Sequence, residues 1–194
     1  MTVRGSKSSI VEPDLLPPVG GKFREIERKA IGVRCFAGAG QTARLDPYAL
    51  ASLLNLRIVS LAELDQLPEE ARNHLSQSDE WSAGTTGLLP DGSRVIVINE
   101  KQSAGRRAAT LMEEICHTLL GHDPSSICGN GVGGRSYDVS VEEEAYAVGA
   151  AALLPYRALT LCLSEGNSTD QIAKRYGVTR ALVEYRMRVL GLWG

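Results

Sequence analysis

The feature that most constrains this chain is a predicted helix at residues 105–121 that carries acidic side chains and a histidine on an apolar background. Leucine and isoleucine recur at helical spacing over residues 111–120, so most of this helix should be buried. Glu113, Glu114 and His117 lie within the same stretch. Acidic groups on a buried helix are costly unless they are paired or bound to a metal ion. The helix is therefore a candidate site as well as a packing element.

The spacing of these polar residues is typical of one kind of metal helix. Glu113 and His117 are four residues apart and should project from the same face. A zincin helix carries two histidine ligands at this spacing, and the glutamate after the first histidine acts as the base. Here Glu113 stands at the position of the first ligand and Glu114 at that of the base. A Glu–His pair at this spacing also occurs simply as helix support.

A third ligand is expected from the helix predicted at residues 141–154. Glu142 shares a helical stripe with Ala145 and Gly149, whose small size would allow two helices to approach closely. Glu142 is therefore the favoured ligand, and Glu144 is the reserve. The alternative is that the acids of this first turn only complement the helix dipole.

Three further residues are candidates for supporting roles. His122 lies five residues after His117, about 140° around a continuous helix, so it reaches the same face only if the helix ends at Gly121. Otherwise His122 is a surface residue or supports a ligand from outside. Arg135 and Tyr137 precede the second helix and either stabilise an oxyanion or pack within a glycine-rich loop.

The rest of the chain gives a mixed α+β pattern. Strands are expected at residues 56–60, 85–89 and 93–99, the last two around Pro90-Asp91-Gly92, which predicts a small antiparallel sheet. An extended substrate is expected to pair with the strand at residues 95–99. Residues 167–190 are typical of a helix-turn-helix, with Thr169 and Thr179 as the expected N-caps of its two helices. Other helices are predicted at residues 23–34, 47–54 and 68–75, and Asp46 is the expected N-cap of the second, which has Pro47 in its first turn.

Four stretches of the chain resemble the ImmA/IrrE family of metallopeptidases. They are Arg106-Arg107 with the segment 113–122, the segment from Glu142 to Pro155, the strand at 95–99 and the helices at 172–190. The resemblance covers roughly residues 45–192. It implies a zincin-like α+β fold, a zinc ion held by two histidines and a glutamate, a glutamate base, and cleavage of a repressor-type protein partner.

Carried over by position, the resemblance implies metal ligands at Glu113, His117 and Glu142 and a base at Glu114. Position 113 departs from the family pattern, which has histidine there. One imidazole and two carboxylates would leave a neutral first shell around zinc and a less acidic bound water. Oxygen ligands would also shift the metal preference toward manganese or iron(II).

The predicted organisation of the chain has three parts. Residues 1–21, rich in Ser, Pro and Gly, form a flexible lead-in, residues 22–160 a metallopeptidase-like domain, and residues 161–194 a helix-turn-helix-like hairpin packed on the same module. We expect a cytoplasmic location, because residues 1–20 lack a signal peptide and no apolar run approaches the length of a membrane span.

Three functions are consistent with the sequence. The first is a metal-dependent peptidase, or peptidase-like regulator, that acts on a protein partner. The second is a catalytically inactive interaction module of a prophage or mobile-element regulatory system. The third is a DNA-binding regulator that uses residues 167–190, although a net charge of −2 makes nucleic-acid binding unlikely on sequence grounds. The oligomeric state is open.

Overall fold

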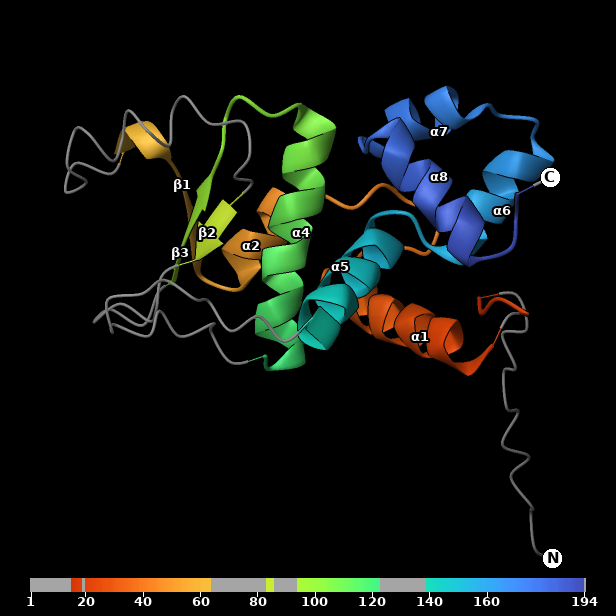
Figure 1. Ribbon diagram of the computed structural model, residues 1–194, viewed down its shortest axis with the longest axis horizontal. Helices are drawn as coiled ribbons and strands as arrows, with labels where there is room; N and C mark the ends of the chain where they lie inside the picture. Colours follow the sequence, from red (N-terminus) through yellow and green to blue (C-terminus); the bar gives the residue numbers. More distant parts are fainter. Residues whose placement is uncertain (1–14, 19, 64–82, 86–93, 123–138, 194) are drawn as a thin grey trace, which may run out of the picture.

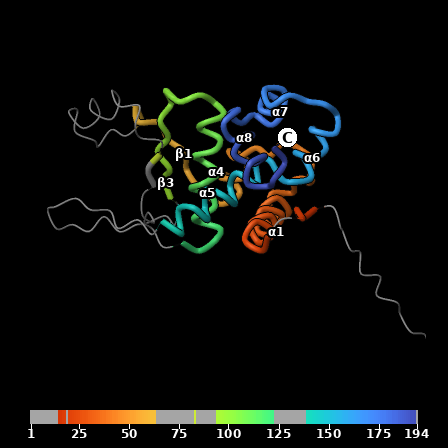
Figure 2. The backbone as a smooth tube through the Cα atoms, turned by 45° about the vertical axis from the view of Figure 1, so that its right-hand side comes forward, coloured from red at the N-terminus to blue at the C-terminus, as the bar shows by residue number. Residues whose placement is uncertain are grey.

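The computed structural model describes residues 15–18, 20–63, 83–85, 94–122 and 139–193. Most of these residues are helical, and a small sheet lies at one end of the molecule (Figure 1). The C-terminal helices gather at the other end, as the rotated view also shows (Figure 2). The two longest of the central helices, α4 and α5, pack against each other between these ends, and α1 packs along α5.

The first two helices follow the sequence signals closely. Helix α1 spans Gly21–Phe36, so it begins two residues before and ends two residues after the predicted range. Helix α2 spans Pro47–Leu53 and is capped as expected, because the Asp46 side chain accepts a hydrogen bond of 2.9 Å from the Tyr48 N–H. Ile26, Ala30 and Leu50 from these helices are buried in the core.

The sheet is mixed, which corrects the prediction that it is antiparallel. Strand β1 (Leu56–Ser60) pairs in parallel with β3 (Arg94–Ile98), while β2 (Ala83–Thr85) pairs antiparallel with β3, in the order β1-β3-β2. The chain between β1 and β3 exceeds the dozen or more residues that a parallel crossover needs. The short helical turn η1 (Leu61–Glu63) begins this connection. The predicted helix at residues 68–75 and the turn Pro90-Asp91-Gly92 lie outside the described residues.

Helix α4 spans Ala104–Leu120, and both of its ends are capped. The Ser103 side chain accepts a hydrogen bond from the Arg106 N–H, and Gly121 adopts the left-handed conformation with φ of 72°. Its apolar face is fully buried, and Leu111, Met112 and Ile115 have no exposed surface. Helix α5 spans Val139–Leu153 and begins two residues before its predicted start.

The C-terminal part contains three helices, of which the sequence predicted two. Helices α7 (Thr169–Tyr176) and α8 (Arg180–Val189) confirm the helix-turn-helix pattern, although Ser168, and not the expected Thr169, caps α7. Helix α6 (Tyr156–Ser164) was not predicted, because Pro155 was taken only as the end of α5. Pro155 ends α5 and also provides the N-cap of α6. The domain boundary predicted after residue 160 falls within α6.

No single helix among the described residues is long and apolar enough to cross a membrane. Helices α5 and α6 pass that test only as a pair, by length and composition, and they are bent by 46° at their junction.

A buried ion pair joins α8 to α1. Arg186 bonds to the Glu27 carboxylate, and both side chains are 1 % exposed. Arg186 also donates to the Leu154 carbonyl, and Glu27 accepts the Tyr156 N–H, so the pair fixes the junction of α5 and α6 as well. Nearby, the buried Arg34 of α1 donates to the Ala152 carbonyl. The hairpin is therefore held to the N-terminal helix by desolvated polar contacts.

We predict that Arg186→Leu lowers the free energy of unfolding by about 3–5 kcal/mol, because it leaves the Glu27 carboxylate buried without its partner. Urea unfolding followed by circular dichroism measures this change. Arg188→Leu, on the exposed face of the same helix, should change stability by less than about 0.5 kcal/mol. A loss below about 1 kcal/mol for Arg186→Leu would show that the pair is not holding the hairpin in place.

Candidate metal centre

The candidate site lies where α4 and α5 cross at close range. A Cβ atom added to Gly149 would lie 3.2 Å from the carbonyl carbon and oxygen of Met112 and 3.3 Å from the Glu113 backbone nitrogen. These distances are shorter than an ordinary van der Waals contact, so a side chain at Gly149 would push the two helices apart, and its absence lets them approach. The approach predicted from Ala145 and Gly149 is confirmed, and it occurs beside the predicted ligand Glu113.

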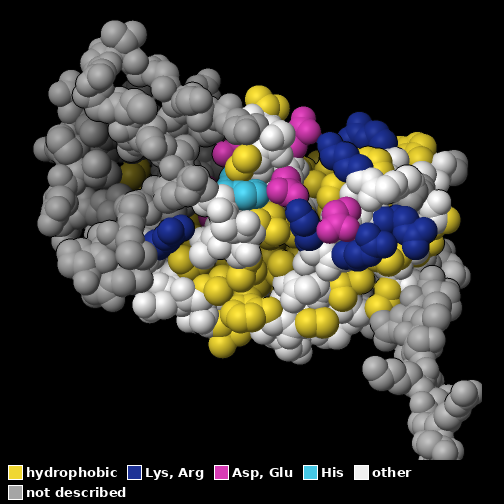
Figure 3. All heavy atoms as spheres, turned by 90° about the horizontal axis from the view of Figure 1, so that it is seen from below, with side chains coloured by type: hydrophobic (Ala, Val, Ile, Leu, Met, Phe, Trp, Pro, Cys, Tyr) yellow, Lys and Arg dark blue, Asp and Glu magenta, His cyan; other side chains and the backbone are white. Residues whose placement is uncertain are grey.

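The crossing brings two of the three predicted ligands together. His117 Nε2 on α4 lies 3.3 Å from Glu142 Oε2 on α5. The two side chains are 20 % and 39 % exposed, so both remain accessible from solvent. Figure 3 shows the histidine side chains beside acidic ones on one face of the molecule.

His122 lies on the same face as His117, because the helix ends where the sequence allowed it to end. The left-handed Gly121 turns the chain, and the His122 N–H donates to the His117 carbonyl at 3.0 Å. As a result His122 Nδ1 lies 3.2 Å from His117 Nδ1, and the rings meet edge to face with centroids 5.2 Å apart. The His122 side chain is only 10 % exposed.

Glu144, the reserve ligand, contacts His122 and not His117. Its Oε2 lies 3.1 Å from His122 Nε2, and its other oxygen accepts a hydrogen bond from Lys29 of α1. These hydrogen bonds, that from Lys29 first, hold the pKa of Glu144 below its ordinary value. Sequence reasoning missed Lys29, because no local pattern links it to a residue 115 positions away.

Glu113 and Glu114 are both half-buried. Burial, followed by the negative charges of Glu114 and Glu142, raises the pKa of Glu113 to about 7, while Arg106 opposes the shift. Glu113 therefore lies near Glu142, in a place where negative charge is poorly compensated by the protein. The raised pKa indicates an environment that would favour a bound cation.

Tyr146 of α5 is a second residue that the sequence analysis missed. Its ring meets that of Tyr185 of α8 edge to face, with centroids 5.2 Å apart. Burial, followed by the influence of Tyr185 and of Glu113, raises the pKa of the Tyr146 phenol. The C-terminal hairpin thus reaches the surroundings of Glu113 through an aromatic contact. Two other candidates, Arg135 and Tyr137, lie outside the described residues.

The basic side chains of the hairpin are largely engaged within the protein. Arg180 bonds to Glu184 at 2.7 Å, Arg175 bonds to Glu165 at 2.9 Å, and Arg186 is buried. Internal pairs of this kind reduce the positive charge that the hairpin presents to a nucleic-acid backbone.

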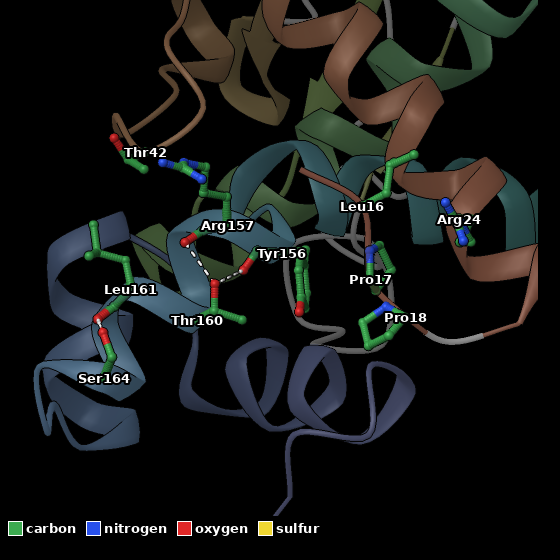
Figure 4. A pocket seen from close by; sticks show the side chains of 10 residues that line it. All are labelled: Leu16, Pro17, Pro18, Arg24, Thr42, Tyr156, Arg157, Thr160, Leu161 and Ser164. Carbon is green, nitrogen blue, oxygen red and sulfur yellow. Dashed lines mark hydrogen bonds between the residues drawn. The ribbon is translucent and has the colours of Figure 1, made fainter. Parts of the chain in front are cut away.

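A hollow with a volume of about 790 Å³ lies elsewhere on the described part of the molecule (Figure 4). It is lined by the lead-in, by α1 and by α6, including Pro17, Arg24 and Tyr156. None of the residues that line it belongs to the predicted site. Figure 4 shows Thr160 turned back to the backbone of its own helix, bonded to the carbonyls of Tyr156 and Arg157.

Comparison with known proteins gives a family match. The description of the matching family is IrrE N-terminal-like domain, Peptidase_M78, and the match covers residues 66–188. The search of curated proteins gave no match. A solved structure of a Mycobacterium tuberculosis transcriptional regulator is similar in fold, with a TM-score of 0.51 and 17 % identity. The match covers 84 % of this chain and 46 % of that one, so the chain spans less than half of the regulator's length.

A peptidase of this family implies a metal ion, with zinc expected. The side chains present fit such an ion chemically. The 3.3 Å between His117 Nε2 and Glu142 Oε2 is about the separation of two ligands of a tetrahedral zinc ion. The uncompensated charge of Glu113 points in the same direction. Within the described ranges, however, no group of three or more His, Cys, Asp or Glu is gathered as a metal site. The structure therefore places two of the three predicted donors in contact and leaves Glu113 outside that contact.

We predict that Gly149→Leu separates α4 from α5 and destabilises the protein by about 1–3 kcal/mol, because the new side chain meets the Met112 backbone. Thermal or urea unfolding measures the loss. Gly32→Ala in α1 is the matched control, because a Cβ there meets nothing within 4 Å, and it should stabilise the helix by up to about 1 kcal/mol. Equal effects of the two substitutions would contradict the close approach at Gly149.

Proposed function

The chain belongs to the IrrE N-terminal-like, Peptidase_M78 family, and from this premise we propose that it is a metal-dependent, peptidase-type regulator that acts on a protein partner. The observation that carries the proposal is the contact of His117 on α4 with Glu142 on α5, at the spacing of two ligands of one ion. The two residues come from separate helices, so this contact is a property of the fold and not of one sequence motif.

In this proposal His117 and Glu142 hold the metal ion, and Glu113 takes the position that is histidine in the family pattern. When bound, the ion supplies a Lewis acid for the scissile carbonyl and makes a water molecule more acidic. Zinc is the expected ion, and manganese or iron(II) are alternatives because two of the donors are carboxylates.

Glu114 is proposed as the general base. It follows Glu113 directly on α4 and is half-buried beside the site. It would take the proton of the attacking water and later deliver it to the leaving amine, which is the ordinary role of a glutamate in this position. The Glu114 side chain is thereby assigned the one step that requires a group able both to accept and to donate a proton.

The substrate cannot pair with β3 as the sequence suggested. Residues 96–98 of β3 pair with β1 on one side and with β2 on the other, so their backbone groups are already used. Within the described sheet β1 and β2 are the outer strands, so strand addition would take place at one of them. An extended protein segment is consistent with the proposal if it binds along one of these edges.

A non-catalytic interaction module is the second candidate. Glu113 replaces the expected histidine, and no group of three potential metal ligands is gathered within the described part of the chain. Both observations favour a peptidase-shaped domain that binds its partner without cleaving it. DNA binding by the hairpin is less well supported, because Arg175 and Arg180 are paired with carboxylates and Arg186 is buried.

We predict that the full chain, supplied with zinc, cleaves members of a proteome-derived peptide library, and that Glu114→Gln lowers cleavage by about 10²-fold or more, because the base is lost. Counting new amino termini by mass spectrometry measures the reaction. Glu143→Gln is the matched control, because Glu143 is exposed on α5 and pairs with Lys22. If the wild type and Glu114→Gln release the same termini, or neither releases any with zinc, manganese or iron(II), the peptidase proposal fails.

A further inference from the structure

The two histidines of the site form a symmetric arrangement that the predicted ligand set does not use. The Nδ1 atoms of His117 and His122 face each other at 3.2 Å. Each ring has its other nitrogen, Nε2, against a carboxylate, which is Glu142 for His117 and Glu144 for His122. Four side chains from two helices and the turn after α4 therefore form one continuous row of contacts.

The contact between the Nδ1 atoms of His117 and His122 requires a proton or a cation between them. Two imidazole lone pairs at 3.2 Å repel each other, so one Nδ1 must donate a proton to the other, or a cation must accept both lone pairs. Two nitrogen ligands of a tetrahedral ion, each about 2.0–2.1 Å from it, are separated by about 3.3 Å. The observed separation suits both arrangements.

The carboxylates of Glu142 and Glu144 lie where they can hold the two histidine rings in place from the side away from the Nδ1 atoms. A metal-bound histidine usually donates its second ring N–H to a carboxylate, which fixes the tautomer and the ring orientation. Glu142 and Glu144 stand in this relation to His117 and His122, each against an Nε2. Glu144 is in turn fixed by its hydrogen bond from Lys29, so the support of His122 extends to α1.

We infer that His117 and His122 bind a divalent transition-metal ion through their Nδ1 atoms, and that Glu142 and Glu144 orient the two rings. The inference rests on the proposed function for the presence of a metal, but it assigns different donors. His122 provides the second imidazole that position 113 lacks, and Glu142 becomes a support. Zinc, cobalt(II) and nickel(II) are the fitting ions, because imidazole suits them better than it suits magnesium or calcium.

This arrangement has a different charge from the predicted one. An ion with two neutral imidazoles retains its full double charge in the first shell, whereas one imidazole and two carboxylates cancel it. The carboxylates of Glu142 and Glu144 at the Nε2 atoms then compensate the ion from outside. A more positive set of metal and ligands makes bound water more acidic. Binding by two imidazoles, in place of one imidazole and two carboxylates, therefore favours a site that can activate water.

The test is titration of the full chain with zinc chloride by calorimetry, and with cobalt(II) chloride by visible absorption. We expect one ion per wild-type chain. His122→Ala should lower the affinity by more than about 100-fold, since loss of a ligand should exceed the 10- to 100-fold effect of losing an outer support. Glu144→Gln should show that smaller effect. Glu113→Ala should lose less affinity than His122→Ala, and Glu143→Gln should bind as the wild type does.

The design separates binding from folding and from catalysis. His122→Gln keeps a hydrogen-bonding side chain at the helix end, and circular dichroism melts verify that each variant is folded. If zinc does not bind the wild type, or if His122→Ala and His122→Gln retain wild-type affinity, the inference is overturned. If zinc binds in a His122-dependent way and no peptide is cleaved, the inference stands and the peptidase proposal fails.

Discussion

At Gly149 the backbones of α4 and α5 come so close that a Cβ atom there would lie only 3.2 Å from the Met112 carbonyl. The arrangement of the candidate site follows from this contact. It places the first two turns of α5, with Glu142 and Glu144, against the last turns of α4, with His117. A larger spacing between the helices would leave the acids on a solvated surface, where they would only complement a helix dipole. The shape of one small residue thus decides whether the polar side chains can share an ion.

The other fixed point is the buried polar junction of α1, α5, α6 and α8. Glu27 and Arg186 are withdrawn from water, and their charges are satisfied by each other and by backbone groups of the α5–α6 junction. Such a pair adds little net stability over a hydrophobic replacement, but it penalises any other arrangement of the hairpin. Lys29, two residues after Glu27 on α1, reaches Glu144. Helix α1 therefore connects the C-terminal hairpin to the candidate site.

Local signals predicted the elements whose ends are determined by neighbouring residues. The strand at residues 56–60 has the predicted limits, and the Asp46 cap and the left-handed Gly121 lie where the sequence placed them. The parallel pairing of β1 with β3 was missed, because the turn signal at residues 90–92 bears only on the neighbouring strand. Helix α6 was missed because a proline that ends one helix can also begin the next.

Some contacts of the candidate site could likewise be predicted from the sequence, and others could not. The contact of His117 with Glu142 followed from helical periodicity in two separate segments, and the close approach at Gly149 followed from residue size. The contact of Glu144 with Lys29 could not be predicted, because it depends on how α1 packs against α5. The sequence left His122 conditional on the end of the helix, and that condition is met in the structure.

The positions 113, 117 and 122 therefore have to be considered together. Residues four apart share a face of a continuous helix, and residues five apart do not. A left-handed residue between them changes this rule, because it reverses the chain and returns the following side chain to the preceding turn. Gly121 acts in this way, and His122 lies against His117 although the helical period places it elsewhere. A histidine lost at the first position of the motif can thus be replaced by one beyond the end of the helix, provided that the helix ends in glycine.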